Sequence, residues 1–455
     1  MSNNKKKIII IGGGLGGLST AAILAKDGHD VEVYEKTLSL GGRSVCKQVG
    51  DYMLDLGIHV CREADQGAAN MVLQKIGKRI EFAIKNSDGN LPQYYYKEKI
   101  ANLPNGFIKF LLYPLLSFSD RLQFLKMMII AFKTQPETLG DMTISQWLQK
   151  NSIKSIDLIN HIKALVGIGY YCYPDIDIIL ASEFVRFLQK IRYDAGYPIG
   201  GWKQIIDKLM QSIKEHNGKI VYGRKIDKIL VENKKAIGIE IDNKGQFKKA
   251  DAIVLGIPLK DISKFIIKDI ETRETIPWSL FPSLSSSFSS EKLETSSAIL
   301  IDLAVKDQIF TKEKDTIVVV DPLVILRNPT KHDKTLAPEG QHLLSVWMPI
   351  PQQKLKDKEY VNNAFIQLEK IIDKVFPGLI SNAIFVRKLQ LDTVIGFYPK
   401  KGMGIESRPD VKFSEFSNIY LVGDSINCPS IGGSSDAAFT SAIYCSNLIN
   451  QQSRL

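Results

Sequence analysis

Apolar and polar positions follow a regular order near the start of the chain. Residues 8–11 are all isoleucine, which is typical of a strand buried on both faces of a parallel sheet. A glycine-rich stretch over residues 12–17 follows, and apolar residues then recur at helical spacing from Leu18 to Ala25. Residues 31–34 have the strand-like sequence VEVY. The pattern predicts a strand, a tight turn, a helix and a second strand, which together form a βαβ unit.

Both helical and strand periodicities recur in the rest of the chain. Apolar residues at helical spacing dominate residues 146–190 and also predict helices over residues 205–215 and 437–448. Alternating segments over residues 298–303 and 343–348 predict neighbouring strands of an antiparallel sheet. We therefore expect a parallel α/β unit together with a separate antiparallel sheet and helices.

The turn after the first strand carries the spacing GxGxxG on Gly12, Gly14 and Gly17. In this motif the first glycine permits the tight turn, the second lets the backbone approach a pyrophosphate, and the third lets the helix pack closely on the sheet. The N-terminus of the helix directs free N–H groups at the phosphates. Glu35 ends the second strand, where an acid accepts hydrogen bonds from a ribose hydroxyl. These features predict a dinucleotide cofactor.

A second glycine pair follows soon after Glu35. Gly41, Gly42 and Arg43 form a GGR sequence, and residues 54–59 read LDLGIH. Together with the βαβ unit, these residues resemble the N-terminal signature of FAD-dependent oxidoreductases in the amine oxidase and phytoene desaturase superfamily, which includes protoporphyrinogen oxidase-like proteins. The resemblance implies that Glu35 binds the adenosine ribose of FAD and that the GGR loop runs beside the pyrophosphate and the flavin.

Two later blocks extend the resemblance. An apolar run over residues 419–422 predicts a buried strand, and it leads into Gly423 and Asp424. In the family this aspartate lies near the ribityl and phosphate groups, and the glycine pair that follows lets a helix N-terminus approach the flavin. Many members carry Gly-Ala where this chain has residues 434–436, SSD. A middle block over residues 197–258 resembles the family's strand pair against the adenine.

The resemblance implies a set of cofactor-binding residues drawn from all three blocks. They are Gly12, Gly14, Leu15, Gly16, Gly17, Glu35, Lys36, Gly42, Arg43, Ile226, Gly423, Asp424, Gly432, Gly433 and Ser434. The implied fold class is α/β, or α+β overall, with a Rossmann-like FAD-binding domain of the glutathione-reductase-2 type. This domain would take residues 1–95, 196–262 and 412–455. An inserted, discontinuous substrate domain with an antiparallel sheet and helices would take residues 96–195 and 263–411.

Catalytic residues are not evident from the sequence. His59 follows the DLG element and is either a group near the flavin edge or a buried structural histidine. Lys400 and Lys401 are better explained as surface residues than as a lysine near the flavin. The aromatic residues Tyr170, Tyr171, Tyr173 and Trp202 either line a substrate cavity or belong to the core.

Composition narrows the class of protein. A chain of 455 residues exceeds one ordinary core, and 44% hydrophobic with 24% charged residues is typical of a globular protein. The five cysteines are scattered without a CxxC pair, so neither a disulfide framework nor a zinc site is indicated, and we expect a cytoplasmic protein. The net charge of +10 comes without a nucleic-acid motif or a basic stripe, so nucleic-acid binding is not expected.

The segment over residues 107–133 combines many apolar residues with Lys109, Arg121, Lys126 and Lys133. Such a segment either forms core helices or lies at a membrane interface, where its basic residues would meet anionic lipids. We therefore expect an anionic membrane surface as a candidate partner, beside an apolar small-molecule substrate.

Three functions remain open at this point. The first is an FAD-dependent oxidoreductase, phytoene desaturase-like, that moves a hydride between a C–C bond of an isoprenoid-like or tetrapyrrole substrate and flavin N5. The second is an amine oxidase, although the two aromatic residues that usually flank an amine are not identifiable. The third is a non-redox protein of the same fold, either a flavin-dependent mutase or a prenyl-binding protein.

Overall fold

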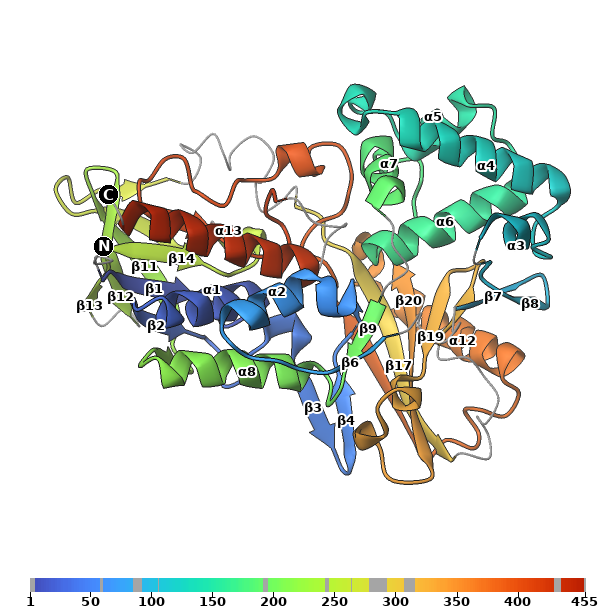
Figure 1. The fold of residues 1–455 in the computed structure, drawn as a ribbon, viewed down its shortest axis with the longest axis horizontal. Helices are drawn as coiled ribbons and strands as arrows, with labels where there is room; N and C mark the ends of the chain where they lie inside the picture. Colours follow the sequence, from blue (N-terminus) through green and yellow to red (C-terminus); the bar gives the residue numbers. More distant parts are fainter. Residues whose placement is uncertain are drawn as a thin grey trace.

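The computed structural model divides into an α/β region and a second region built on a large sheet and a cluster of helices (Figure 1). It describes residues 5–57, 60–84, 92–104, 106–190, 195–241, 245–262, 264–277, 293–306, 316–428 and 435–453. His59, Gly432, Gly433 and Ser434, which the sequence singled out, lie outside these residues.

A five-stranded parallel sheet forms the centre of the α/β region, in the order β10-β2-β1-β14-β22. Its strands are β1 (Lys7–Ile11), β2 (Asp30–Tyr34), β10 (Lys219–Val221), β14 (Ala252–Leu255) and β22 (Ile419–Leu421). Ile10 lies opposite Val33 on one side and Val254 on the other. Because β1 is central and covered on both faces, its isoleucines are buried, as the apolar run predicted.

Four helices pack beside this sheet, and the two termini lie close together there (Figure 1). They are α1 (Leu15–Lys26), α2 (Ala68–Lys75), α8 (Trp202–Glu215) and α13 (Ser435–Ser453). Helix α1 contacts both α8 and α13, so segments distant in sequence close around it. The predicted helices over residues 205–215 and 437–448 are confirmed, and each is longer than its apolar pattern indicated.

A second five-stranded sheet adjoins the first in the order β13-β12-β11-β15-β16. Its strands are β11 (Ile226–Glu232), β12 (Lys235–Ile241), β13 (Gln246–Lys249), β15 (Ile266–Asp269) and β16 (Thr275–Ile276). Strand β11 pairs parallel with β15 and antiparallel with β12. Strands β15 and β16 follow the short helix α9 (Leu259–Ile262), so this sheet continues past residue 262.

The second region contains a seven-stranded sheet in the order β21-β17-β20-β19-β18-β7-β8. Its strands are β7 (Gln93–Tyr96), β8 (Lys99–Asn102), β17 (Ser297–Lys306), β18 (Thr316–Val319), β19 (Val324–Arg327), β20 (Gln341–Ile350) and β21 (Phe385–Leu391). The predicted antiparallel neighbours are confirmed, because β17 pairs antiparallel with β20 and Leu300 lies opposite Trp347. Both faces of β17 and β20 are buried, since α12 (Lys358–Val375) covers one face and the opposite face borders the main core.

A cluster of helices lies beside this sheet (Figure 1). It contains α3 (Phe107–Leu111), α4 (Phe118–Lys133), α5 (Ile144–Lys150), α6 (Ile156–Tyr170) and α7 (Ala181–Lys190). Side-chain oxygens of Ser117, Thr143 and Ser155 accept hydrogen bonds from the first turns of α4, α5 and α6, as N-cap residues do. The helical prediction over residues 146–190 is confirmed. The division of the chain into two domains stays a prediction.

The remaining described elements connect these layers. They are β3 (Cys46–Val49), β4 (Tyr52–Asp55), β5 (Cys61–Arg62), β6 (Phe82–Ile84) and β9 (Ala195–Pro198). Strands β3 and β4 form an antiparallel hairpin, and β9 pairs with both β5 and β6. The β5–β9 pair links the segment after the hairpin to the segment that enters α8.

Candidate cofactor site

A cavity of about 920 Å³ lies where the carboxyl ends of β1, β2, β14 and β22 meet. Ligands of open parallel sheets bind in this position, and the volume is at the upper end of the usual range for small-molecule sites. Most residues predicted to bind a cofactor line this cavity, although the predictions came from three distant blocks. These residues are Gly12, Gly14, Leu15, Gly16, Glu35, Lys36, Gly42, Arg43, Ile226, Gly423 and Asp424.

The three glycines of the GxGxxG turn differ in the atoms that an added Cβ would contact. A Cβ on Gly12 would lie 2.5 Å from the Gly256 carbonyl oxygen, and the residue has a φ of +106°. A Cβ on Gly17 would lie 2.1 Å from the Gly12 carbonyl oxygen, so this glycine allows α1 to pack on β1 rather than lining the cavity. Within the described residues, the atom nearest to a Cβ on Gly14 would be the Gly256 carbonyl oxygen, at 3.9 Å. Gly14 therefore leaves space in which a ligand could approach the backbone.

The carboxylate of Glu35 is fixed at the end of β2. Its Oε2 atom accepts a hydrogen bond of 2.8 Å from the Gly13 N–H. Its Oε1 atom accepts from the Thr37 N–H at 2.8 Å and from the Thr37 hydroxyl at 2.9 Å. The Gly41 N–H also donates to the Gly13 carbonyl at 2.8 Å. The glycine turn, the acid and the GGR loop therefore form one connected wall.

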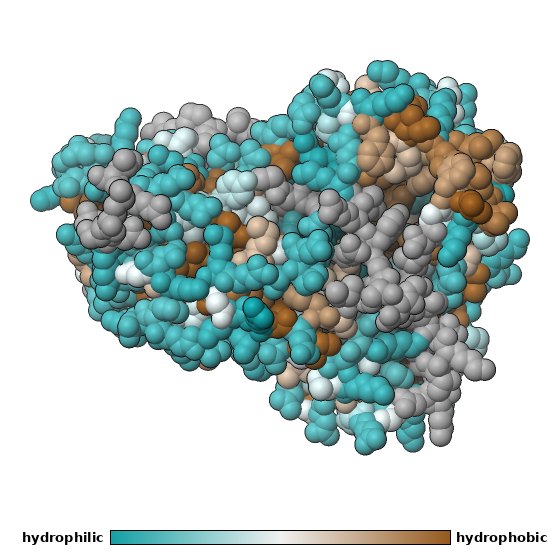
Figure 2. Space-filling model, viewed as in Figure 1, coloured by the Kyte–Doolittle hydropathy of each residue, from teal (hydrophilic) through white to brown (hydrophobic). Residues whose placement is uncertain are grey.

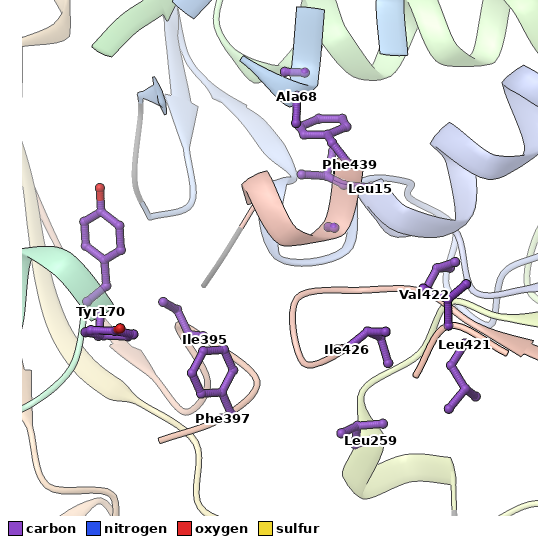
Figure 3. Close-up of a cluster of buried hydrophobic side chains, with 14 of the residues drawn as sticks. Leu15, Ala68, Tyr170, Leu259, Ile395, Phe397, Leu421, Val422, Ile426 and Phe439 are labelled. Atoms are coloured by element: carbon purple, nitrogen blue, oxygen red, sulfur yellow. The ribbon is translucent and has the colours of Figure 1, made fainter. Parts of the chain in front are cut away.

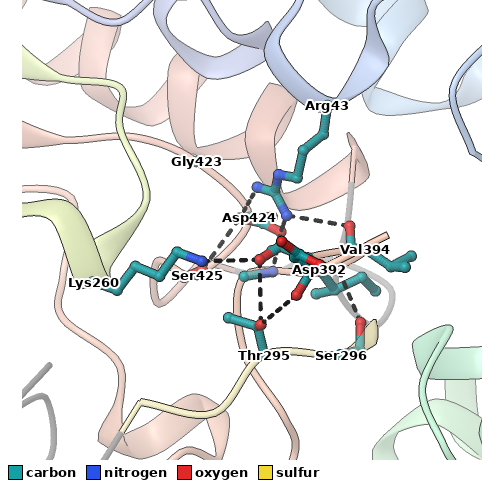
Figure 4. A network of polar contacts seen from close by, with 12 residues as sticks. Arg43, Lys260, Thr295, Ser296, Asp392, Val394, Gly423, Asp424 and Ser425 are labelled. Carbon is teal, nitrogen blue, oxygen red and sulfur yellow. Dashed lines mark hydrogen bonds and ion pairs between the residues drawn. The ribbon is translucent and has the colours of Figure 1, made fainter. Parts of the chain in front are cut away.

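Arg43 and Asp424 come from distant parts of the chain and pair with each other (Figure 4), and both line the cavity. The guanidinium Nη1 and Nη2 atoms donate to the two carboxylate oxygens at 2.7 Å each. Asp424 Oδ2 also accepts from the Gly396 N–H at 2.8 Å, and Arg43 donates to the Val394 carbonyl at 3.2 Å. The Arg43 side chain keeps 38% of its surface exposed toward the cavity, whereas Asp424 keeps 6%.

The ionisation of Asp424 depends on this pairing. Burial alone would raise the pKa of Asp424, but the Arg43 charge and the hydrogen bonds from Arg43, Gly396 and Ser425 lower it below its ordinary value. The carboxylate therefore stays charged at neutral pH. The resemblance placed both residues near the cofactor but did not indicate that they bind each other.

A small apolar hollow of about 20 Å³, room for about one water molecule, adjoins the cavity. The large cavity and the hollow share Gly57 and Tyr171 in their walls. The rest of the hollow is lined by Leu300, Ile325, Arg327, Ser345 and Trp347 of the seven-stranded sheet. Tyr171 meets Trp347 edge to face, with ring centroids 6.3 Å apart and planes at 87°.

The cavity is backed by the main apolar core (Figure 3). Leu15 at the start of α1 and Phe439 of α13 lie together in this core, and Ile395 lies beside Phe397. The Phe439 ring stacks on Trp202, with planes at 6° and centroids 6.3 Å apart. Trp202 also lines the cavity, so one wall is rigid and aromatic.

The other sequence candidates separate into two groups. Tyr171 and Trp202 line the cavity, whereas Tyr170 is in the core with its hydroxyl donating to the Glu183 carbonyl at 2.7 Å. Tyr173 is 40% exposed. Lys400 forms an ion pair with Glu294, and Lys401 lies 2.7 Å from Asp141. Neither lysine is among the residues that line the cavity.

Several lining residues were not found from the sequence. The segment over residues 390–394 and the side chains of Arg62 and Lys260 border the cavity and lie outside every block that the sequence singled out. They belong to no short motif, because they come together only when the parallel sheet, the hairpin and the seven-stranded sheet assemble. Among the residues that the structure describes, no group of three or more His, Cys, Asp or Glu side chains is placed to hold a metal ion.

Comparison with known proteins identifies the class. The family model described as flavin containing amine oxidoreductase matches residues 15–450, and the chain belongs to this family. The resemblance to FAD-dependent oxidoreductases of the amine oxidase and phytoene desaturase superfamily is thereby confirmed, and the family implies a flavin cofactor.

Individual relatives cover most of the chain. It is 24% identical over 484 residues to the 4,4'-diapolycopen-4-al dehydrogenase of Metabacillus indicus, covering 92% of this chain and 93% of the relative. It is 22% identical over 404 residues to the zeta-carotene-forming phytoene desaturase of Myxococcus xanthus, covering 77% and 74%. The solved structure of an oxidoreductase from Methanosarcina mazei shares the fold with a TM-score of 0.76 at 22% identity, covering 97% of this chain and 100% of that one.

Proposed function

We propose that this oxidoreductase binds FAD and moves a hydride between a C–C bond of an apolar isoprenoid-like or tetrapyrrole substrate and flavin N5. The observation that carries the proposal is the continuity of the cavity. The cavity runs from a glycine turn suited to a pyrophosphate to a wall that includes the apolar residues Leu56, Val60 and Tyr171. Two relatives whose names denote carotenoid-modifying enzymes support this substrate class.

The residues present fit FAD. The N-terminus of α1 faces the cavity without an acidic residue in its first turn, so its N–H groups and dipole favour an anionic pyrophosphate. Gly14 leaves room for close approach, and Glu35 is held at the strand end where a ribose hydroxyl would bind. Arg43 would present its exposed side to the phosphate–ribityl part of the cofactor.

Bound FAD would supply the hydride-accepting chemistry. The chain itself would position the substrate and exclude water. Its Arg43–Asp424 pair would keep both of these side chains ionised. Tyr171 and Trp202 provide aromatic walls, and the Arg43–Asp424 pair fixes two oppositely charged groups beside them. We assign no catalytic acid or base among the described residues, and the role of His59 stays a prediction.

Amine oxidation is the alternative reaction that the family also supports. The geometry of Tyr171 and Trp347 favours the first reaction, because the two rings meet edge to face at 87° and do not face each other in parallel as a pair flanking one amine would.

The first experiment is an absorbance spectrum of the purified protein followed by anaerobic mixing with candidate reductants. Bleaching of a flavin spectrum by a polyprenyl or tetrapyrrole substrate would support the proposed reaction. Bleaching by amines would establish the alternative. A flavin reduced by dithionite alone would favour the non-redox mutase, and a protein that binds no FAD after reconstitution would refute the proposal.

We also propose that helices α3 and α4 contact an anionic membrane surface. Seven large apolar side chains on or beside these helices are 48–73% exposed, and they form a brown area at the upper right of Figure 2. They are Phe107, Ile108, Leu112, Phe118, Leu122, Ile129 and Phe132. Contiguous apolar surface of this kind marks an interaction site. No helix in the described part of the chain is long and apolar enough to cross a membrane.

Charge favours lipid as the partner of this α3–α4 surface. Lys109, Lys126 and Lys133 are exposed on the same two helices, while Met127 and Ala131 are buried on the inner side of α4. Basic residues beside exposed apolar groups match an anionic bilayer, in which each lysine contributes about 1 kcal/mol of attraction.

Sedimentation with vesicles of phosphatidylglycerol and phosphatidylcholine tests this surface. Changing Lys109, Lys126 and Lys133 to Glu should lower the partition constant by at least on the order of 100-fold, from about 1 kcal/mol per residue. The matched control is Lys214→Glu on the exposed side of α8, which should leave binding unchanged. In a second comparison, Leu112→Ser should weaken binding and Phe247→Ser, 48% exposed on β13, should not. Unchanged sedimentation, or a dimer abolished by Leu112→Ser, would refute membrane contact.

A further inference from the structure

Arg62 is a cation in the cavity wall whose hydrogen-bonding capacity is mostly unused. It lies in β5 and borders the cavity near Gly57, Val60 and Tyr171, at the end that adjoins the apolar hollow. Its Nη2 atom donates to the Gly169 carbonyl at 2.7 Å. Its Nε atom is buried without a hydrogen-bond partner. A guanidinium has five N–H donors, so this single hydrogen bond leaves most of them for another acceptor.

No carboxylate among the described residues forms an ion pair with Arg62. The buried acid of the neighbouring α7, Glu183, is 3.5 Å from Arg408 and accepts hydrogen bonds from the Ile405 N–H and the Tyr170 hydroxyl. Asp424 likewise forms its ion pair with Arg43. Arg62 is half-buried, and a charge removed from water without a counter-ion is costly, so such groups are usually paired.

Arg62 is held in place by groups that do not neutralise it. Its guanidinium carbon lies 5.8 Å from the ring centroid of Tyr171 and 5.9 Å from that of Phe187. Gly169 belongs to the last turn of α6, where the helix dipole favours a positive charge. Aromatic faces and a helix C-terminus stabilise the cation while leaving it able to bind an anion. The site is therefore fixed before any ligand arrives.

We infer that Arg62 binds the carboxylate end of an amphipathic substrate whose apolar body lies in the large cavity, against Leu56, Val60 and Tyr171. Tyr171 lies beside both parts, because its ring centroid is 5.8 Å from the Arg62 guanidinium carbon and the residue also lines the cavity. A planar carboxylate matches the planar donor fork of arginine. This inference rests on the proposed function and narrows its substrate class from an apolar compound to an apolar acid. Arg62 is a binding residue in this account and takes no part in bond breaking.

The test compares two probes that differ only in their polar end, farnesoate and farnesol, with the flavin-loaded protein. Binding is measured by calorimetry and by the flavin difference spectrum. Farnesoate should bind the unaltered protein more tightly than farnesol. Arg62→Gln should weaken farnesoate binding by about 10- to 150-fold, the usual range for a hydrogen bond to a charged group, and leave farnesol unchanged. Arg62→Lys should recover part of the preference, and Arg79→Gln, an exposed arginine outside the cavity, should have no effect.

Each contrary outcome has a separate meaning. If Arg62→Gln weakens the binding of farnesoate and of farnesol equally, the residue only supports the end of α6. This result would overturn the inference. A protein that keeps its flavin but prefers farnesol, or binds neither probe, would also overturn it while leaving the proposed function intact. Loss of flavin from Arg62→Gln would assign the arginine to the cofactor instead. A protein without flavin from the start would refute the proposed function itself.

Discussion

Gly14 offers the sharpest test of the cofactor site because the protein does not need a glycine there. Its φ is −76°, which other residues adopt, and an added Cβ would stay 3.9 Å from the nearest atom of the residues that the structure describes. Gly14→Ala should therefore leave the apoprotein folded. Alanine is a poorer N-cap residue than glycine, and we expect a cost of about 1 kcal/mol or less in the free energy of unfolding.

The same methyl group would project into the space proposed for the pyrophosphate. If FAD is present at 100 times its Kd, binding stabilises the unaltered protein by about 2.7 kcal/mol. Gly14→Ala should lose this stabilisation, so adding FAD should no longer raise the unfolding midpoint. The contrasting variant is Gly17→Ala, whose Cβ would lie 2.1 Å from a backbone oxygen. It should destabilise the protein with or without FAD.

The assay measures flavin per polypeptide after reconstitution and the thermal midpoint with and without added FAD. Gly14→Ala should contain little flavin and show an apoprotein midpoint close to that of the unaltered chain. If Gly14→Ala takes up a full equivalent of FAD with unchanged affinity, the pyrophosphate does not pass this glycine and the reasoning is wrong.

Three further predictions concern stability. Asp424→Asn should lower the free energy of unfolding by about 1–3 kcal/mol at neutral pH, because it weakens the contact with Arg43. The pKa of Asp424 is lowered in the folded state, so the stability difference between the variant and the unaltered protein should shrink below about pH 4. Urea unfolding at a series of pH values measures this difference. Asp302→Ala should cost about 3 kcal/mol by leaving Arg387 without its buried partner, seen as a lower denaturant midpoint; an unchanged midpoint would contradict this. Leu368→Ala, under the seven-stranded sheet, should cost about 2–5 kcal/mol in the same assay, whereas Ile366→Ala, 41% exposed, should cost far less.

The sequence allowed the parallel sheet and its glycine turn to be predicted because each depends on neighbouring residues. Four isoleucines, a tight turn and an amphipathic helix specify a βαβ unit locally, and the structure contains it as β1, α1 and β2. The alternation over residues 298–303 and 343–348 likewise indicated the β17–β20 pair.

The parts that could not be predicted depend on contacts between distant segments. The Arg43–Asp424 ion pair joins residues 381 positions apart, and no local pattern marks either as a partner of the other. Arg62 and Trp347 enter the walls of the cavity and the hollow from different sheets. The apolar segment over residues 107–133 is periodic whether its outer side faces protein or lipid, so only the structure could show that seven of its large side chains are exposed.

The β14–β22 pair has a consequence for how the protein is made. Ile253 pairs with Ile419, 166 residues later in the chain, so the parallel sheet acquires its fifth strand long after the first four have left the ribosome. At roughly 5–20 residues per second, this interval lasts on the order of 8–33 s. During that time Arg43 has no Asp424 to pair with and the cavity has no far wall. We therefore expect cofactor capture to be a late event in synthesis, because a chain interrupted before β22 lacks the part of the cavity wall that Val422, Gly423 and Asp424 form.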